Sequence, residues 1–130
     1  MTEQKLMEYC QSKLGAVLEY PFDPVTAVFK TGDKIFALIY EDSGIVKISL
    51  KCEPMLAEFL RQQYQSVTPG WHLNKTHWNT VLCDGGVPDD EIFRQIDGVI
   101  YDTNIHAVPP SLKHRRFFPC SYRPYFPLRP

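Results

Sequence analysis

A dense run of residues with chemically useful side chains lies in the middle of the chain, directly after a Pro-Gly pair. It comprises Trp71, His72, Asn74, Lys75, His77, Trp78 and Asn79. Tryptophan offers a flat face on which a base can stack, while lysine and histidine donate hydrogen bonds to phosphate or carboxylate. Tryptophan is also a frequent residue of cores and their rims, so Trp71 and Trp78 fit a structural role equally well. The run therefore predicts either a nucleic-acid contact or a packed turn.

The spacing of the two histidines argues against a metal site. His72 and His77 are five residues apart, with Cys83 following. Residues five apart face opposite sides of a strand and lie about 140° apart on a helix, so neither element directs both imidazoles at one ion. The run also contains no carboxylate. We expect no metal site here.

Patterns typical of catalysis or of cofactor binding do not occur in the sequence. It contains neither GxSxG, GxGxxG nor GxxxxGK[ST], and its one Gly-Gly pair, Gly85-Gly86, is better explained as a turn before a helix. No cysteine stands beside a histidine in a local catalytic signature. We therefore expect a binding protein without a cofactor rather than an enzyme.

Charge is distributed unevenly along the 130 residues. The formal net charge is −1, which gives no global attraction to nucleic acid or to an anionic membrane. All 15 acidic residues lie at or before Asp102, so residues 1–105 are net acidic and residues 106–130 are basic. A nucleic-acid site in the first part of the chain thus requires a local basic patch.

Cysteine usage and hydropathy indicate a reduced, soluble protein. The four cysteines are widely spaced without a CxxC pair, and the polar start MTEQKLMEYC lacks the apolar region of a signal peptide. Apolar runs are far shorter than the roughly 20 residues that cross a bilayer. We expect a cytoplasmic protein that does not contact a membrane.

The elements that must position these residues are those of a single α+β domain. Periodicity and capping predict helices over 2–14, 54–64 and 88–102, with Leu14 on the apolar stripe of the first. Segments 25–30, 34–40 and 45–51 are predicted to form an antiparallel meander joined by small polar turns, and 78–83 a further strand. In the 45–51 strand, Lys47, Ser49 and Lys51 alternate with apolar residues, so that face of the sheet meets solvent or a polar partner. The stretches at 20–24 and 68–70 both contain proline and are expected to separate the predicted elements as extended or turn segments.

The C-terminal segment differs from the rest of the chain. Residues 106–130 combine several arginines with closely spaced aromatic rings and six of the 11 prolines, which predicts an extended or polyproline II arm. Such an arm could contact nucleic acid, or its rings could be covered by this domain or by a second copy. We expect self-association through this tail, over residues 116–130.

Several motifs together resemble the MmcQ/YjbR family of small bacterial proteins. They are Tyr20-Pro21-Phe22, Phe29-Lys30, Leu50-Lys51-Cys52, Leu60-Arg61 and, most specifically, the run HLNKTHW over residues 72–78 followed by Asp84-Gly85. The similarity covers about residues 1–115. It implies a single domain with helices packed on one face of an antiparallel sheet, similar to the CyaY fold, and a DNA-binding role.

The leading hypothesis is therefore a DNA-binding module whose site combines the central run with nearby basic residues. The candidate contacts are Lys75, His72, His77, Asn74, Trp71, Trp78, Arg61, Lys47 and Lys51. The rival hypothesis is a protein-interaction module that uses the sheet face or the aromatic tail.

Overall fold

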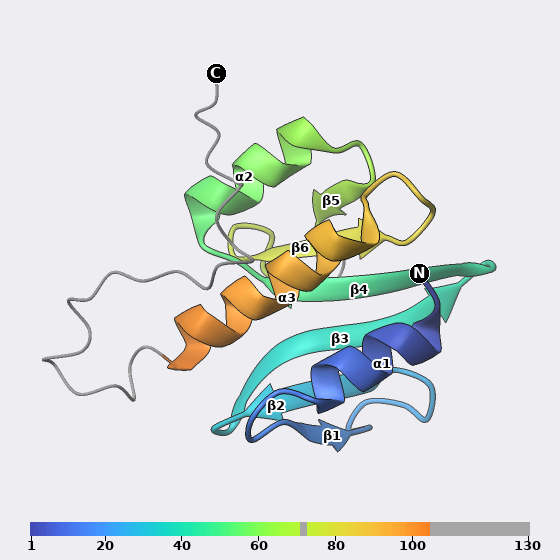
Figure 1. Ribbon diagram of the computed structural model, residues 1–130, viewed down its shortest axis with the longest axis vertical. Helices are drawn as coiled ribbons and strands as arrows, with labels where there is room; N and C mark the ends of the chain where they lie inside the picture. Colours follow the sequence, from blue (N-terminus) through green and yellow to red (C-terminus); the bar gives the residue numbers. More distant parts are fainter. Residues whose placement is uncertain (71–72, 105–130) are drawn as a thin grey trace, which may run out of the picture.

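A computed structural model describes residues 1–70 and 73–104 of the chain (Figure 1). Along this part of the chain the elements are α1 (Glu3–Gln11), β1 (Val17–Glu19), β2 (Ala27–Thr31), β3 (Lys34–Asp42), β4 (Ile45–Lys51), α2 (Pro54–Gln63), β5 (Val67–Pro69), β6 (Trp78–Leu82) and α3 (Asp89–Asn104). The predicted tail at residues 116–130 lies outside the described residues.

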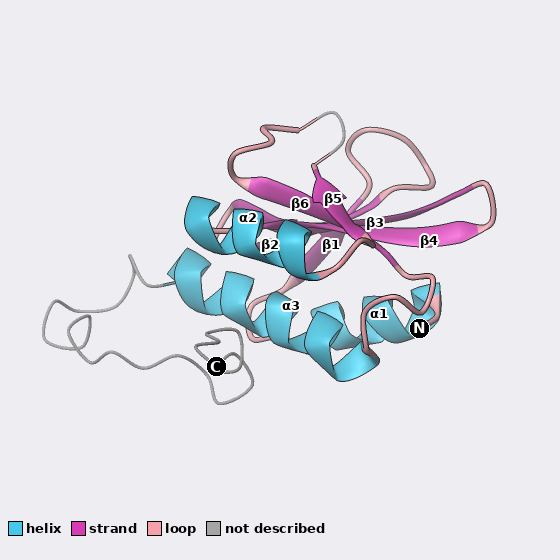
Figure 2. Ribbon diagram, turned by 90° about the horizontal axis from the view of Figure 1, so that it is seen from above, coloured by secondary structure: helices cyan, strands magenta, loops and turns pink. Residues whose placement is uncertain are grey.

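The six strands form one sheet in the order β1-β2-β3-β4-β6-β5, and every neighbouring pair is antiparallel. All three helices lie on the same side of this sheet, and within residues 1–70 and 73–104 no helix covers its other face (Figure 2). The predicted fold class, a single α+β domain with helices on one face of an antiparallel sheet, is confirmed. The likeness to the CyaY fold stays a prediction.

The central meander agrees closely with its sequence pattern. β4 has the predicted bounds, and β3 lies between β2 and β4. Two-residue turns join these strands, and both residues of each turn have positive φ, at Gly32-Asp33 and at Ser43-Gly44. This conformation matches the right-handed twist of the paired strands.

Two short edge strands were not predicted, and one predicted strand begins late. Val17–Glu19, just before the proline-containing stretch at 20–24, pairs with β2. Val67–Pro69 overlaps the stretch at 68–70 that was expected to separate elements, yet it pairs with β6. Its proline is compatible with an edge strand because one side of that strand has no hydrogen-bonding neighbour. β2 starts at Ala27 because the Asp23 carboxylate accepts hydrogen bonds from the backbone N–H groups of residues 25 and 26.

The first helix is shorter than its apolar pattern predicts. The Thr2 hydroxyl caps it by accepting from the backbone of Lys5, as expected, but the helix ends at Gln11 and leaves Leu14 93% exposed. Lys13 lies beyond the helix and forms a 2.6 Å ion pair with Asp97 of α3. This contact fixes the end of α1 against α3 instead of extending the helix.

The hydrophobic core fills the space between the sheet and the helices. It contains Phe29, Phe36, Ile48, Leu50, Leu60, Val81, Ile92 and Ile96 among others. No helix in the described part of the chain is long and apolar enough to cross a membrane.

Candidate functional site

The sheet face turned away from the helices carries most of the described candidate residues, and we call it the open face. In β4, Val46, Ile48 and Leu50 contact the core, so the intervening side chains of Lys47, Ser49 and Lys51 point to the open face, as predicted. Cross-strand register extends this face over the neighbouring strands. Its described residues there include Leu38 and Tyr40 of β3, Trp78, Thr80 and Leu82 of β6, and Thr68 of β5.

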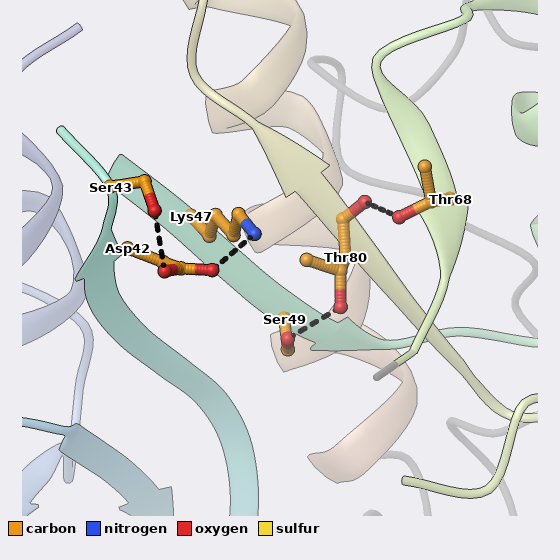
Figure 3. A network of polar contacts seen from close by, with 6 residues as sticks. All are labelled: Asp42, Ser43, Lys47, Ser49, Thr68 and Thr80. Atoms are coloured by element: carbon orange, nitrogen blue, oxygen red, sulfur yellow. Dashed lines mark hydrogen bonds and ion pairs between the residues drawn. The ribbon is translucent and has the colours of Figure 1, made fainter. Parts of the chain in front are cut away.

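A row of hydroxyl groups crosses the middle of the open face (Figure 3). The hydroxyls of Ser49 and Thr80 are 2.8 Å apart, and the Thr68 hydroxyl donates to the backbone carbonyl of Thr80 at 3.1 Å. Ser49 and Thr80 are almost fully buried. Since buried polar groups are costly unless they are paired, these contacts stabilise the row, which forms a polar floor across β4, β6 and β5.

Lys47 borders this floor at the end near the β3–β4 turn. Its Nζ lies 3.0 Å from Asp42 Oδ2, and the Ser43 hydroxyl donates to the other carboxylate oxygen of Asp42 (Figure 3). These hydrogen bonds, that from Lys47 first, hold the pKa of Asp42 below its usual value. The carboxylate therefore stays ionised and competes with any external anion for Lys47.

Lys75 approaches the same floor from the turn that precedes β6. Its Nζ donates to the Gly70 carbonyl at 3.1 Å, and the Asn74 side chain accepts from the backbone N–H of Thr76 at 2.9 Å, which stabilises the turn. The structure thus gives Asn74 a local structural contact, while Lys75 remains exposed.

A cavity of about 340 Å³ brings the two lysines together. It is lined by Tyr40, Lys47, Thr68, Pro69, Lys75, Thr80 and Leu82. Three of the elements that supply these residues were predicted, but Tyr40, Thr68 and Thr80 were not recognised as site residues. The signal that could have found them is strand register, since Tyr40 faces Lys47 and Thr80 faces both Ser49 and Thr68.

Lys51 and Trp78 form a cross-strand pair at the other end of β4. Lys51 is exposed and Trp78 is half-buried. The backbone of Gly70 packs closely on Trp78 and donates to its carbonyl at 2.8 Å. Trp78 therefore combines both roles left open by its sequence context: it is packed on one side and lies on the open face.

Arg61 does not join this surface. It extends from α2, on the helix-covered side, and its Nη1 donates to the Lys75 carbonyl at 3.0 Å and to Asn79 Oδ1 at 2.8 Å. Asn79 is 1% exposed and donates in turn to the Ala57 carbonyl. Arg61 thus holds the turn before β6 in place, which differs from the phosphate contact expected of it.

Of the three remaining predicted contacts, only His77 is among the described residues. His77 is exposed, and its backbone carbonyl accepts from Cys52 N at 2.7 Å, so it marks the start of β6 beside β4. Trp71 and His72 lie outside the described residues.

Two of the three described thiols, those of Cys10 and Cys83, are poorly suited to nucleophilic chemistry. Burial raises the pKa of Cys10 to about 12 and that of Cys83 to about 11, so both remain protonated near neutral pH. Within residues 1–70 and 73–104, no group of three histidine, cysteine or carboxylate side chains is arranged to hold a metal ion. The open face offers ammonium groups, hydroxyls and aromatic rings, which are groups that bind anions and flat apolar ligands.

Comparison with known proteins agrees with this architecture. Residues 11–98 match the YjbR family model. The chain is 39% identical over 109 residues to YjbR of Escherichia coli (strain K12), covering 84% of this chain and 92% of that protein, and 24% identical over 111 residues to YyaQ of Bacillus subtilis (strain 168), covering 75% and 93%.

Solved structures show the same fold. The crystal structure of Deinococcus radiodurans protein DR2400 superposes with a TM-score of 0.76 at 33% identity, covering 85% of this chain and 83% of that one. A solution NMR structure of a Pseudomonas syringae protein gives a TM-score of 0.68 at 31% identity, covering 79% and 93%. The protein is thus a small α+β protein with one open sheet face. It belongs to the YjbR family, the family that its central motif resembles.

Proposed function

We propose that this protein binds DNA through the open face, with Lys47, Lys51 and Lys75 as the phosphate contacts. The observation that carries the proposal is the position of these three lysines, which come from a strand and a turn far apart in the sequence and share one side of the sheet. Phosphate contacts from lysine supply most of the sequence-independent affinity of proteins for DNA. The role is one of binding, without catalysis.

Segregation of charge supports this assignment despite the acidic balance of residues 1–105. On α1, α2 and α3 taken together acidic residues outnumber basic ones, and the first turn of α3 alone contains Asp89, Asp90 and Glu91. β4 contributes two lysines and no carboxylate to the open face, and one of these lysines, Lys47, is paired with Asp42 of β3. Since exposed charges beyond about 10 Å are largely screened at ordinary salt concentrations, the lysines act locally and the acidic helices on the other side repel DNA only weakly.

A protein partner is the second candidate, and the far edge of the sheet favours it. Around β1 several large apolar side chains are exposed, among them Leu14 at 93%, Phe22 at 66% and Val25 at 68%. Exposed apolar patches beside a free strand edge are typical of docking surfaces. Self-association through residues 116–130 concerns undescribed residues and stays a prediction.

Salt-dependent binding of fluorescently labelled DNA, in both single-stranded and duplex form, tests the leading proposal. The logarithm of the affinity should fall linearly with the logarithm of the salt concentration, and Lys51→Ala or Lys75→Ala should reduce that slope by about one unit each. Lys5→Ala is the matched control, because it removes the same charge from α1 on the other side of the molecule. Absence of binding to either form at low salt, or an equal effect of Lys5→Ala, would contradict the proposal and favour a protein partner.

A further inference from the structure

The cavity on the open face is larger than phosphate contacts alone require. Its volume of about 340 Å³ lies at the small end of the roughly 300–1,000 Å³ typical of ligand sites. Lysines that only touch the backbone of a duplex need no cavity, because the phosphates lie on the outside of the double helix. The hollow between Lys47 and Lys75 therefore has room for a part of a ligand to enter it.

The chemistry of the lining describes that part. Tyr40, Leu82 and Pro69 provide a ring and aliphatic surface, and the Thr68 hydroxyl lies among them. Tyr40 is the cross-strand neighbour of Lys47 on β3 and β4, so one aromatic residue and one lysine line the same part of the cavity, with the Lys47 ammonium directed to Asp42. A flat apolar group attached to an anion fits this arrangement, and a nucleotide has both.

The residues of the floor and the two lysines are held in place by contacts within the protein. Ser49, Thr80 and Thr68 hold one another through the contacts of 2.8 Å and 3.1 Å described above (Figure 3). Lys47 is oriented by Asp42 and Lys75 by the Gly70 carbonyl. A site formed before the ligand arrives loses little conformational entropy on binding.

From these features we infer that the cavity accepts one unpaired nucleotide, with its base against Tyr40 and its flanking phosphates between Lys47 and Lys75. The protein then binds single-stranded DNA more tightly than duplex DNA, because a duplex keeps its base faces inside the stack. Base stacking on aromatic side chains, combined with lysines along the backbone, is the usual mode of single-strand binding. This inference rests on the proposed function and specifies the form of DNA.

Competition between a short oligothymidylate and a duplex of the same length tests the inference on the full chain. The oligothymidylate should bind more tightly, and Tyr40→Ala should weaken its binding by between about fivefold and a hundredfold while affecting the duplex less. Tyr20→Ala is the matched control, since Tyr20 is an exposed tyrosine that follows β1 at the opposite edge of the sheet.

The outcomes distinguish failure of the single-strand site from failure of DNA binding as a whole. Tighter binding of the duplex, or an equal effect of Tyr20→Ala and Tyr40→Ala, overturns the single-strand site and leaves DNA binding intact. Failure of both DNA forms to bind overturns both proposals. If Tyr40→Ala does not fold, amide chemical shifts of the unmodified protein during titration with oligothymidylate decide the matter. They should change most at residues 40, 47, 68, 80 and 82, and changes centred on β1 instead would refute the site.

Discussion

Arg61 offers the sharpest test of how the site is held together, because its type alone fits two roles. A phosphate contact would leave its guanidinium in solvent, whereas the structure directs Nη1 to the Lys75 carbonyl and to Asn79 Oδ1. The two hydrogens of one nitrogen thus connect α2 to the turn before β6 and to β6 itself. Arg61→Ala removes both bonds.

The expected loss of stability follows from the burial of the acceptors. Asn79 is 1% exposed, so its amide oxygen would be left unsatisfied, which costs about 1–3 kcal/mol. Water can replace Arg61 at the carbonyl of the exposed Lys75, so that bond adds little. We expect Arg61→Ala to lower the free energy of unfolding by about 2 kcal/mol, which corresponds to a fall in melting temperature on the order of 10 °C.

Urea denaturation followed by circular dichroism measures this loss, with Lys30→Ala as the control. Lys30 makes a 3.4 Å ion pair with Glu19 in which both side chains are partly exposed, and such pairs contribute about 0–1 kcal/mol. A double-mutant cycle with Asn79→Ala should give a coupling energy between about 0.5 and 3 kcal/mol.

The same variant distinguishes the two roles of Arg61 in DNA binding. As a structural contact, Arg61 leaves the salt dependence of DNA binding by the folded variant unchanged, whereas loss of a phosphate contact would reduce the slope by about one unit. The structural role of Arg61 is refuted by three results together: Arg61→Ala destabilises no more than Lys30→Ala, it shows no coupling to Asn79, and it reduces the slope of affinity against salt concentration.

Two further substitutions test the open face and its support. Asp42→Asn removes a carboxylate that competes for Lys47 and should tighten DNA binding about two- to fivefold, as measured by fluorescence anisotropy. Glu19→Gln makes the same charge change on β1 and should alter the affinity little. Equal effects of the two substitutions would rule out a local cause. Gly70→Ala places a Cβ 2.6 Å from Trp78 Cβ and 3.1 Å from its backbone oxygen, so it should destabilise the fold by about 1–3 kcal/mol in urea denaturation, and an unchanged midpoint would show that the contact relaxes freely.

The parts of the fold that could be predicted are those in which local pattern and tertiary packing agree. Residues 45–51 alternate between apolar and polar side chains, and this alternation fixed both the strand and the direction of its lysines. Pro54 and the acidic residues at 89–91 marked the starts of α2 and α3 because proline and negative charge suit the first helical turn.

The edge strands and the end of α1 could not be found in the same way. β1 and β5 contain only three residues each, and their extended shape comes from pairing with β2 and β6 rather than from a pattern of their own. Leu14 continues the apolar period of α1, but the helix ends at Gln11, where the Ser12 hydroxyl donates to the Tyr9 carbonyl, and Lys13 beyond it pairs with Asp97 of α3. The apolar period alone shows neither the strand pairing nor these contacts.

For the candidate site, the sequence identified lysines but not the surface they share. Register joins Tyr40 to Lys47 and Thr80 to Thr68, although these pairs come from separate segments of the chain. Arg61 has the residue type of a phosphate contact, and only its partners reveal its different position. The motifs therefore identified the basic residues, while the sheet topology determines which of these residues lie on one surface.

The position of the turn before β6 links the two sides of the sheet. Lys75 presents its ammonium group to the cavity on the open face, while its backbone carbonyl is held by Arg61 from the helix-covered side. Gly70 closes the same turn through the Lys75 side chain and through its tight packing on Trp78. A change in how α2 packs would thus move one wall of the cavity without altering any residue that lines it. Substitutions in α2 should consequently affect ligand affinity through the position of Lys75, even though α2 itself lies behind the sheet.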